Sequence, residues 1–270
     1  MENKENKIGF IAKAKKFRLF FFLLAILLVL VLTEHLLSDS YKVMTESMLP
    51  TIQVGQRIIV KEILYGRRIT SDNNKNNKPK FKRLPGIRHI EPNDIVCFNS
   101  PKGIWGQIQF NKDVVYCKRI LGTPGDRIGA VDGHYWNDKK LKPIGIVDEQ
   151  EKLRWMHNGV FIWNKTYTLF PESGLGWNIK NWGPLLVPAK GMKIILNENN
   201  RELYRHVIEY EMGSELGDIG TYTFCDNYYF AVGDNVMNSN DSRYWGFIPE
   251  DFIIGIVAGK KVRSNFDLRH

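Results

Sequence analysis

The chain has 270 residues and a formal net charge of +9, with 43% hydrophobic and 25% charged residues. This composition is that of a globular protein and excludes wholesale disorder. The positive charge alone would favour nucleic-acid binding. However, residues 1–18 carry +4 and residues 61–90 carry +7, which leaves −2 on the rest of the chain. The folded bulk is therefore slightly acidic, and we expect no nucleic-acid partner.

The N-terminal segment combines a basic tail with an apolar run. Residues 19–32 are uninterruptedly apolar, and the flanking residues extend the run to 19–37, close to the length of about 20 that a membrane span needs. A cleavable secretory signal begins in the same way but needs a small-x-small exit, whereas residues 33–39 read Thr-Glu-His-Leu-Leu-Ser-Asp. We therefore expect an uncleaved, single-pass anchor in the cell (inner) membrane. The basic tail stays cytoplasmic, so everything after about residue 38 is extracytoplasmic.

Beyond the anchor the pattern is typical of β-structure. Short β-branched or aromatic runs bounded by Gly, Pro, Asn or Asp predict strands at residues 56–63, 94–98, 114–121, 228–232 and 252–257. An Asp-Gly pair predicts a hairpin over residues 131–134. One helix is expected over residues 197–210, where apolar side chains recur at helical spacing.

The fold class that these elements predict is mainly β. Residues 66–92 are polar, basic and interrupted by prolines, which predicts an inserted loop. We expect a β-rich core with a second, smaller β-rich lobe, preceded by one N-terminal transmembrane helix. The expected divisions are a cytoplasmic basic tail (1–18), the anchor (19–37), the first part of the core (38–130), the second lobe (131–220) and the second part of the core (221–270).

The cysteines and histidines do not predict a metal site. Cys97, Cys117 and Cys225 are scattered, and neither they nor the six histidines have metal-ligand spacing. Each Cys is interpreted as a small buried apolar residue. If this region is exported, one pair could oxidise, and the sequence leaves open which pair. We expect neither a metal nor a cofactor.

Three stretches stand out as carriers of chemistry. Residues 45–51 read Thr-Glu-Ser-Met-Leu-Pro-Thr, residues 116–126 read Tyr-Cys-Lys-Arg-Ile-Leu-Gly-Thr-Pro-Gly-Asp, and residues 233–246 read Gly-Asp-Asn-Val-Met-Asn-Ser-Asn-Asp-Ser-Arg-Tyr-Trp-Gly. No Gly-x-Ser-x-Gly elbow accompanies them, nor a His in a triad context. In this order they resemble the type I signal peptidases (leader peptidases, family S26), membrane-anchored serine proteases that remove signal peptides from exported proteins.

The resemblance implies a serine-lysine dyad, with Ser47 as the nucleophile and Lys118 as the general base. An amine acts as a base only when it is neutral, and lowering its pKa from about 10.4 to about 8 costs roughly 3 kcal/mol. Burial among apolar neighbours supplies this cost. Alternation along the predicted strand puts Lys118 on one face with Tyr116 and Ile120. Without the other motifs, Lys118 and its neighbouring arginine would be an ordinary charged pair at a strand end.

By the same resemblance, other residues complete the site. Thr45 would offer a hydroxyl to the oxyanion hole beside the Ser47 backbone N–H, and Ser239 would orient the lysine amine. Asp241 and Arg243 match a buried ion pair that braces the site. Further residues expected near it are Gly233, Asp234, Met48 and Pro50.

Glu46 is a departure from the family pattern, which commonly has a small residue beside the nucleophile. Its carboxylate would raise the pKa of the lysine unless it points to solvent. This feature favours an alternative, an anchored and catalytically impaired scaffold that binds signal peptides. Another alternative is a relative that processes one exported partner. A self-cleaving SOS-type repressor is disfavoured by the anchor and by the Asn-Ser-x-Asp-Ser-Arg block.

The expected partners are signal-peptide-bearing preproteins and the lipid bilayer, which residues 61–90 would meet at anionic headgroups.

Overall fold

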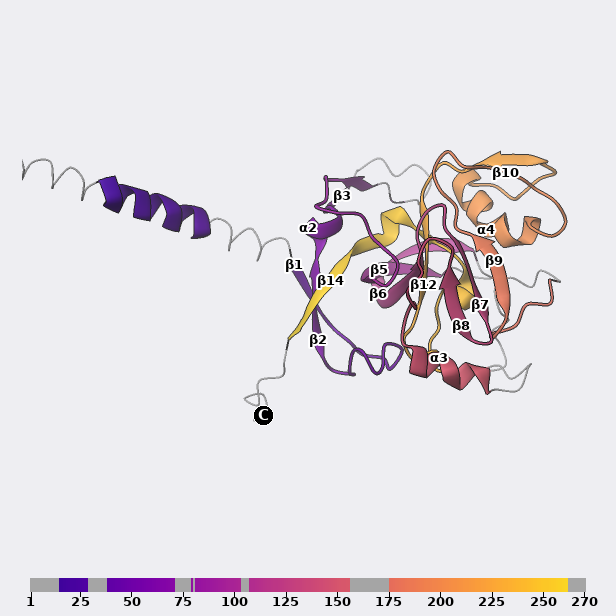
Figure 1. Ribbon diagram of the computed structural model, residues 1–270. Coiled ribbons are helices and arrows are strands. Elements are labelled where there is room, and N and C mark those ends of the chain that lie inside the picture. Colours follow the sequence, from indigo (N-terminus) through magenta and orange to yellow (C-terminus); the bar gives the residue numbers. More distant parts are fainter. Residues whose placement is uncertain are drawn as a thin grey trace, which may run out of the picture. The chain divides into compact units, whose positions relative to one another are not determined.

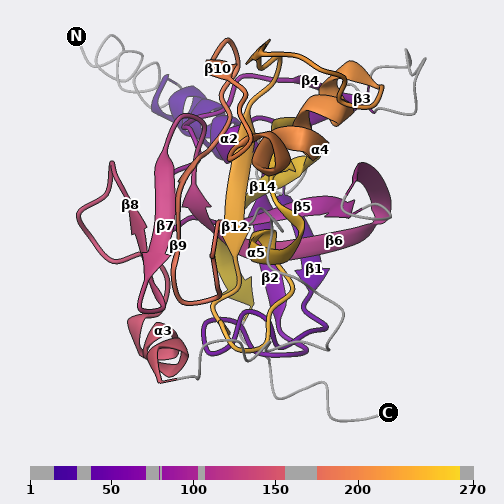
Figure 2. The ribbon, with the colours of Figure 1, turned by 90° about the vertical axis from the view of Figure 1, so that its right-hand side faces the viewer.

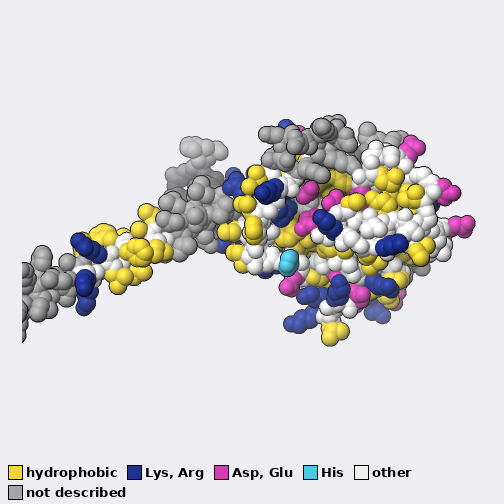
Figure 3. Space-filling view, turned by 90° about the horizontal axis from the view of Figure 1, so that it is seen from above, with side chains coloured by type: hydrophobic (Ala, Val, Ile, Leu, Met, Phe, Trp, Pro, Cys, Tyr) yellow, Lys and Arg dark blue, Asp and Glu magenta, His cyan; other side chains and the backbone are white. Residues whose placement is uncertain are grey.

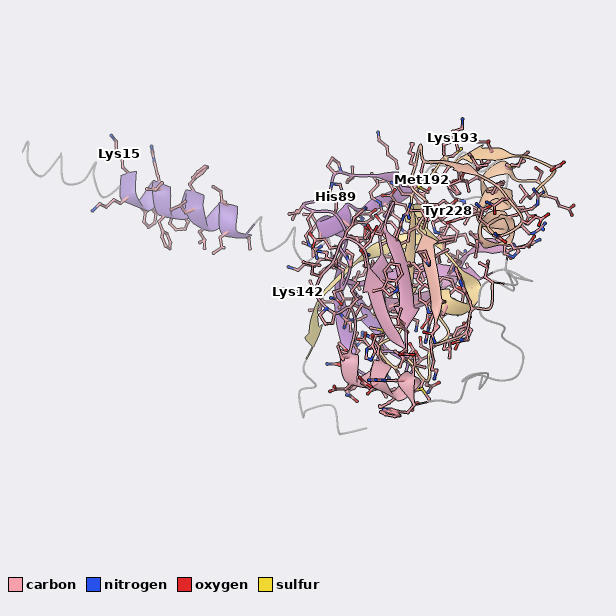
Figure 4. The ribbon with its side chains drawn as sticks, turned by 45° about the vertical axis from the view of Figure 1, so that its right-hand side comes forward. Lys15, His89, Lys142, Met192, Lys193 and Tyr228 are labelled. Carbon is pink, nitrogen blue, oxygen red and sulfur yellow. The ribbon has the colours of Figure 1, made fainter. Side chains whose placement is uncertain are left out.

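The computed structural model describes residues 15–28, 38–70, 79, 81–102, 107–155 and 175–261 (Figure 1). Its contacts divide the chain into two units, residues 1–38 and 39–270. In the first unit, residues 15–28 form a helix that Lys15 begins (Figure 4). Basic side chains gather near its beginning and apolar ones cover the rest of it (Figure 3).

The predicted anchor is only partly covered by the described residues. Residues 29–37 of the predicted span lie outside them, as do residues 1–14 of the tail. Across the ranges that the structure describes, no helix has both the length and the apolar character needed to cross a membrane.

The second unit is built around a seven-stranded sheet with the strand order β1-β2-β14-β5-β6-β12-β13 (Figures 1 and 2). Its strands are β1 (Ser38–Lys42), β2 (Arg57–Lys61), β14 (Ile253–Lys261), β5 (Ile95–Lys102), β6 (Ile108–Gly122), β12 (Tyr228–Val232) and β13 (Ile248–Pro249). Each of the five predicted strands overlaps one of these, so the mainly β class is confirmed. The pairings of β14 with β2 and β5, and of β6 with β5 and β12, are antiparallel.

A three-stranded sheet follows, in the order β8-β7-β9. It consists of β7 (Arg127–Val131), β8 (His134–Asn137) and β9 (Trp182–Leu186). The β7–β8 hairpin confirms the predicted one: Asp132 and Gly133 both have positive φ, 49° and 84°, as a type I′ turn requires. A small β10 (Lys193–Ile195) and β11 (Thr221–Thr223) pair lies further along the chain.

The helices differ from the sequence prediction. The predicted helix over residues 197–210 begins later, as α4 (Arg201–Met212), because the Asn197 side chain accepts hydrogen bonds from the backbone N–H groups of Asn199 and Asn200 and holds a turn there. The unpredicted α3 (Val147–Arg154) is polar on most of its surface and therefore gave no amphipathic signal. Short helical turns form α2 (Glu62–Tyr65), α5 (Ser242–Trp245) and η2 (Glu250–Phe252).

The prediction of a plain loop over residues 66–92 was wrong in part. Strands β3 (Arg68–Thr70) and β4 (Phe81–Arg83) pair there antiparallel. Arginines tie this hairpin to the fold: Arg68 donates to Asp251 O, and Arg83 donates to Gly66 O and Ile253 O. These bonds are tertiary and leave no periodicity in the local sequence.

The large sheet carries different apolar clusters on its two faces. Val96, Phe98 and Ile120 belong to one cluster, whereas Cys97 packs with Val43, Met48, Ile52 and other residues in another. The second cluster anchors the segment between β1 and β2, in which Ser47 lies.

The prediction of three buried cysteines was right for Cys97, while Cys117 is half-buried. It was wrong for Cys225, which is exposed just beyond β11.

Candidate active site

Ser47 lies in the turn between β1 and β2, and its neighbours hold it from two sides. Met48 and Ile52 are buried in the core beneath it, and the Ile52 N–H donates to Met48 O at 2.8 Å. On the other side the Asn235 N–H donates to Ser47 O at 3.1 Å. The Ser47 side chain is 9% exposed. The nucleophile candidate is thus fixed by packing on one side and by the loop after β12 on the other.

Lys118 lies on β6 and reaches Ser47 although 70 residues separate them in sequence. A hydrogen bond joins Lys118 Nζ and Ser47 Oγ, and Lys118 is 3% exposed. Nζ also lies 5.9 Å from the centre of the Tyr116 ring, which confirms that the two side chains share a face. Burial lowers the pKa of Lys118 to about 8, and Arg243 adds to this lowering while Asp241 opposes it. The pair therefore has the geometry and the basicity of a nucleophile with its base.

Thr45 and Ser239 are the other two hydroxyl residues that the sequence predicts. Thr45 Oγ1 lies 3.4 Å from Ser47 Oγ, at an exposed position. Ser239 is buried, and its Oγ has no hydrogen-bond partner among the described residues. The structure therefore brings Thr45 to the serine and shows no bond between Ser239 and the lysine amine.

Gly233 explains how Ser239 approaches the nucleophile. A Cβ at this position would lie 2.1 Å from Ser239 Oγ and 2.5 Å from Ser47 O. Only a residue without a side chain fits there, because real Cβ atoms do not make such contacts. The absence of a side chain at Gly233 lets the Ser239 hydroxyl and the Ser47 backbone pack against the same point.

Asp241 and Arg243 form the buried ion pair that the resemblance implies. Their side chains are fully buried and joined by Nε–Oδ1 and Nη2–Oδ2 bonds of 2.8 Å each. Arg243 also donates to Val236 O, and Asp241 accepts the Gly233 N–H at 2.9 Å. Burial raises the pKa of Asp241, but the charge and hydrogen bonds of Arg243 outweigh burial, so the net pKa lies below the usual range. The pair fixes both ends of the loop after β12.

A second bidentate ion pair was missed by sequence reasoning. Arg119 Nε and Nη2 donate to the two carboxylate oxygens of Asp234 at 2.6 and 2.7 Å, and Arg119 Nη1 donates to Asn93 O. The Asp234 side chain is fully buried. Because Arg119 follows Lys118 directly, this pair ties the strand with the lysine to the loop with Ser239. Both residues lie in the quoted motifs, and Asp234 was expected near the site, but nothing in the local sequence pairs them.

Glu46 does not lie against the lysine amine. Its Oε2 accepts a hydrogen bond from Asn238 at 3.0 Å, and its backbone O accepts one from Asn235 at 3.2 Å, both at exposed positions. The charged residues that act most strongly on the Lys118 pKa are Asp241, Arg243 and Asp234. The carboxylate is thus held on the surface. This is the orientation in which, by the sequence analysis, Glu46 would not raise the pKa of the lysine.

No group of three or more His, Cys, Asp or Glu side chains within the described ranges is arranged to hold a metal ion.

Comparison with known proteins identifies the family of the chain. A family model described as "Signal peptidase, peptidase S26" matches residues 16–260. The chain belongs to this signal peptidase family. It is a serine endopeptidase, as members of the S26 family are.

Several individual proteins are similar to this chain. Signal peptidase I of Buchnera aphidicola subsp. Baizongia pistaciae is 27% identical over 276 residues, which cover 94% of this chain and 79% of that protein. Signal peptidase I of Pseudomonas aeruginosa is 28% identical over 239 residues, covering 88% of this chain and 66% of that protein. A crystal structure of a signal peptidase I from Enterococcus faecalis aligns with a TM-score of 0.31 and 19% identity, covering 64% of this chain and 99% of that one.

Proposed function

We propose that this S26 peptidase removes N-terminal signal peptides from exported preproteins with a Ser47–Lys118 dyad. The observation that carries the proposal is the buried Lys118 amine, hydrogen-bonded to Ser47 Oγ, with its pKa lowered to about 8. A neutral amine in this position can take the serine proton at a physiological pH, which an ordinary lysine cannot do.

The first half of the reaction forms an acyl-enzyme. Neutral Lys118 accepts the Ser47 hydroxyl proton as Oγ attacks the scissile carbonyl carbon. The oxyanion that develops is held by the Ser47 N–H and by Thr45 Oγ1, which already lies 3.4 Å from Ser47 Oγ. The lysine ammonium then gives its proton to the leaving amine, and the mature protein departs.

The second half hydrolyses the ester. Lys118, neutral again, takes a proton from water, the resulting hydroxide attacks the acyl carbon, and the proton returns to Ser47 Oγ. Once Ser47 Oγ is acylated, the Lys118 amine no longer bonds to it. In this step Ser239 Oγ would accept a hydrogen bond from an N–H of the Lys118 amine. Its buried, unpartnered Oγ beside Gly233 supports this role among the described residues. The Asp241–Arg243 pair would hold the loop that presents Ser239.

The substrate class follows from the family. By resemblance, the cut follows small side chains at the first and third positions before it. We also propose that residues 19–37 anchor the enzyme as a single-pass span with its N-terminus cytoplasmic, so that the site meets signal peptides at the outer membrane surface. The division into a two-part catalytic core (38–130 and 221–270) and a second lobe (131–220) stays a prediction.

The bilayer is the second proposed partner, through the basic segment of residues 61–90. Several of its arginines are engaged within the fold: Arg68 and Arg83 with backbone carbonyls, and Arg88 with the Asp94 carboxylate. Contact with anionic headgroups would therefore fall to the lysines of this segment, of which those at 75, 78 and 80 lie outside the described residues. Replacing the lysines of the segment with Gln should weaken the binding of residues 39–270 to anionic vesicles, and unchanged binding would contradict the proposal.

The cleavage assay tests the central proposal. Detergent-solubilised full-length protein is incubated with a preprotein, beside its Ser47→Ala and Lys118→Ala variants. We expect a mature product from the wild type alone, with its new N-terminus after a small residue. Equal processing by either variant would reject the dyad. An inactive wild type that still binds the preprotein would favour the non-cleaving scaffold.

A further inference from the structure

One pair of sulfur atoms lies outside the proposed mechanism but directly beside it. Cys97 on β5 and Cys117 on β6 are register partners, and the next pair along the ladder is Val96 with Lys118. The register is regular from Ile95 to Asn99 on β5, so the two cysteines are directly opposite each other. Both thiols are free in the structure.

The type of pairing decides how close their backbones come. The Ile120 N–H donates to Asp94 O at 2.8 Å, one residue beyond the Ile95–Arg119 pair, so Ile95 and Arg119 are a non-hydrogen-bonded pair of the ladder. Hydrogen-bonded and non-hydrogen-bonded pairs alternate along antiparallel strands, which makes Cys97 and Cys117 a non-hydrogen-bonded pair. Such pairs have Cα atoms about 4.5 Å apart, within the range of about 4.4–6.8 Å that disulfides span.

The side chains also meet. Cys97 is a buried member of the apolar cluster that contains Val43 and Met48, and the half-buried Cys117 packs against the same cluster. Cys225 is exposed beyond β11, where its backbone N–H donates to Glu211 and its Sγ lies 4.0 Å from Thr223 O. Of the three pairings that the sequence allows, the strand register selects one.

We propose that Cys97 and Cys117 form a cross-strand disulfide when this domain faces an oxidising compartment, and that this disulfide fixes the β5–β6 register beside Lys118. The compartment rests on the proposed extracytoplasmic placement, whereas the ability to form the bond rests on the strand register alone. Cys117, one of the two residues that this modification would change, directly precedes Lys118 in the sequence.

The difference in burial between Cys97 and Cys117 determines which thiol reacts first. Cys97 is fully buried, and its hydrogen bond to Cys117, together with burial, raises its pKa, so its thiol is a poor first nucleophile. The half-buried Cys117 is the entry point. Its thiolate attacks an external disulfide, such as that of oxidised glutathione, and releases one thiolate.

The second step closes the bond. The Cys97 thiolate attacks the Cys117 sulfur of the mixed disulfide and expels the second external thiolate. The two protons of the cysteines pass to the two released thiolates. The external disulfide is thereby reduced to two thiols while the protein loses two hydrogen atoms, and no other reactant is needed.

Mass spectrometry of the full-length protein in detergent tests the proposal. The protein is equilibrated with reduced or oxidised glutathione, the remaining thiols are alkylated without unfolding and again after unfolding, and the peptides are mapped. After oxidation we expect a linked Cys97–Cys117 peptide that has lost two hydrogen atoms, with the exposed Cys225 recovered either as an alkylated thiol or as its mixed disulfide with glutathione. Three alkylated thiols in the unfolded sample after oxidation would overturn the proposal.

Variants provide the controls. Cys225→Ser should still form the link, and it also removes exposed thiols that could join two molecules. Cys97→Ser and Cys117→Ser should lose the link. A link between Cys225 and either other cysteine in the wild type, with none in Cys225→Ser, would overturn the proposal.

Thermal unfolding adds an independent readout. The unfolding midpoint of Cys225→Ser should rise on oxidation and return on reduction, while Cys97→Ser should show no such shift. Because mass and midpoint are measured without a preprotein, their outcome is separate from the cleavage assay: a missing link leaves the dyad untouched, and an inactive enzyme leaves the disulfide untouched.

Discussion

The ionisation of Lys118 gives the sharpest test of the proposed mechanism. Burial lowers its pKa from the ordinary value of 10.5 to about 8. A lowering of this size corresponds to roughly 3 kcal/mol of free energy. The neutral fraction of the amine is then roughly one tenth at pH 7 and roughly nine tenths at pH 9, since each pH unit changes the ratio of the two forms tenfold.

Activity should follow this neutral fraction. We expect kcat/KM for preprotein cleavage to rise close to tenfold per pH unit below about pH 8 and to level off above it, because only the neutral amine can accept the serine proton. The measurement is a pH series in detergent with the full-length enzyme and one preprotein, with Glu46→Gln as a matched variant. A profile that keeps rising to the pKa of an exposed lysine would refute the reasoning.

Stability should show the same shift with a defined sign. The folded pKa of Lys118 lies below the unfolded one, so between about pH 8 and 10.5 the unfolded chain binds more protons and stability rises with pH. Below pH 8 the folded protein bears the full cost of the buried charge. Lys118→Met should therefore be more stable than the wild type at pH 7, by up to about 3 kcal/mol. The difference should shrink towards pH 10.5, and a pH-independent difference in urea unfolding would contradict this.

Substitutions at three further positions follow from the geometry. Thr45→Val should lower kcat by roughly 10²- to 10³-fold in the cleavage assay and leave KM nearly unchanged, while Thr45→Ser should keep activity. Asp241→Asn should lower the free energy of unfolding in urea by about 3–5 kcal/mol, because it leaves Arg243 buried without its counter-charge. Gly233→Ala should lose activity, since its Cβ would displace Ser239 and the Ser47 carbonyl, and wild-type cleavage would contradict this.

Local sequence patterns predicted much of the fold. Short β-branched or aromatic runs indicated strands that overlap β2, β5, β6, β12 and β14, and the Asp-Gly pair indicated the hairpin at residues 131–134. These signals are local, because residue preference and turn chemistry act within a few neighbouring residues of the chain. The late start of α4 and the β3–β4 pair were not predicted, because an asparagine turn and arginine bonds to distant carbonyls decide them.

The residues of the candidate site likewise fall into those that the sequence predicted and those that it did not. The motifs alone named Ser47, Lys118, Asp241 and Arg243, because the resemblance depends only on the order and spacing of residues. The bidentate bond of Arg119 to Asp234 was not among these predictions. It links two motifs that meet only after the sheet has formed, so no local pattern reveals it.

The sequence by itself therefore determined the fold class, the order of the motifs and the residues to which chemistry could be assigned. Only the tertiary structure decided how these residues interact: that the lysine is buried against the serine, that Glu46 is held by Asn238 at the surface, and that Cys97 faces Cys117. The physical reason is that pKa values and pairings depend on distance and burial. Both are set by strand register and packing between segments far apart in the chain.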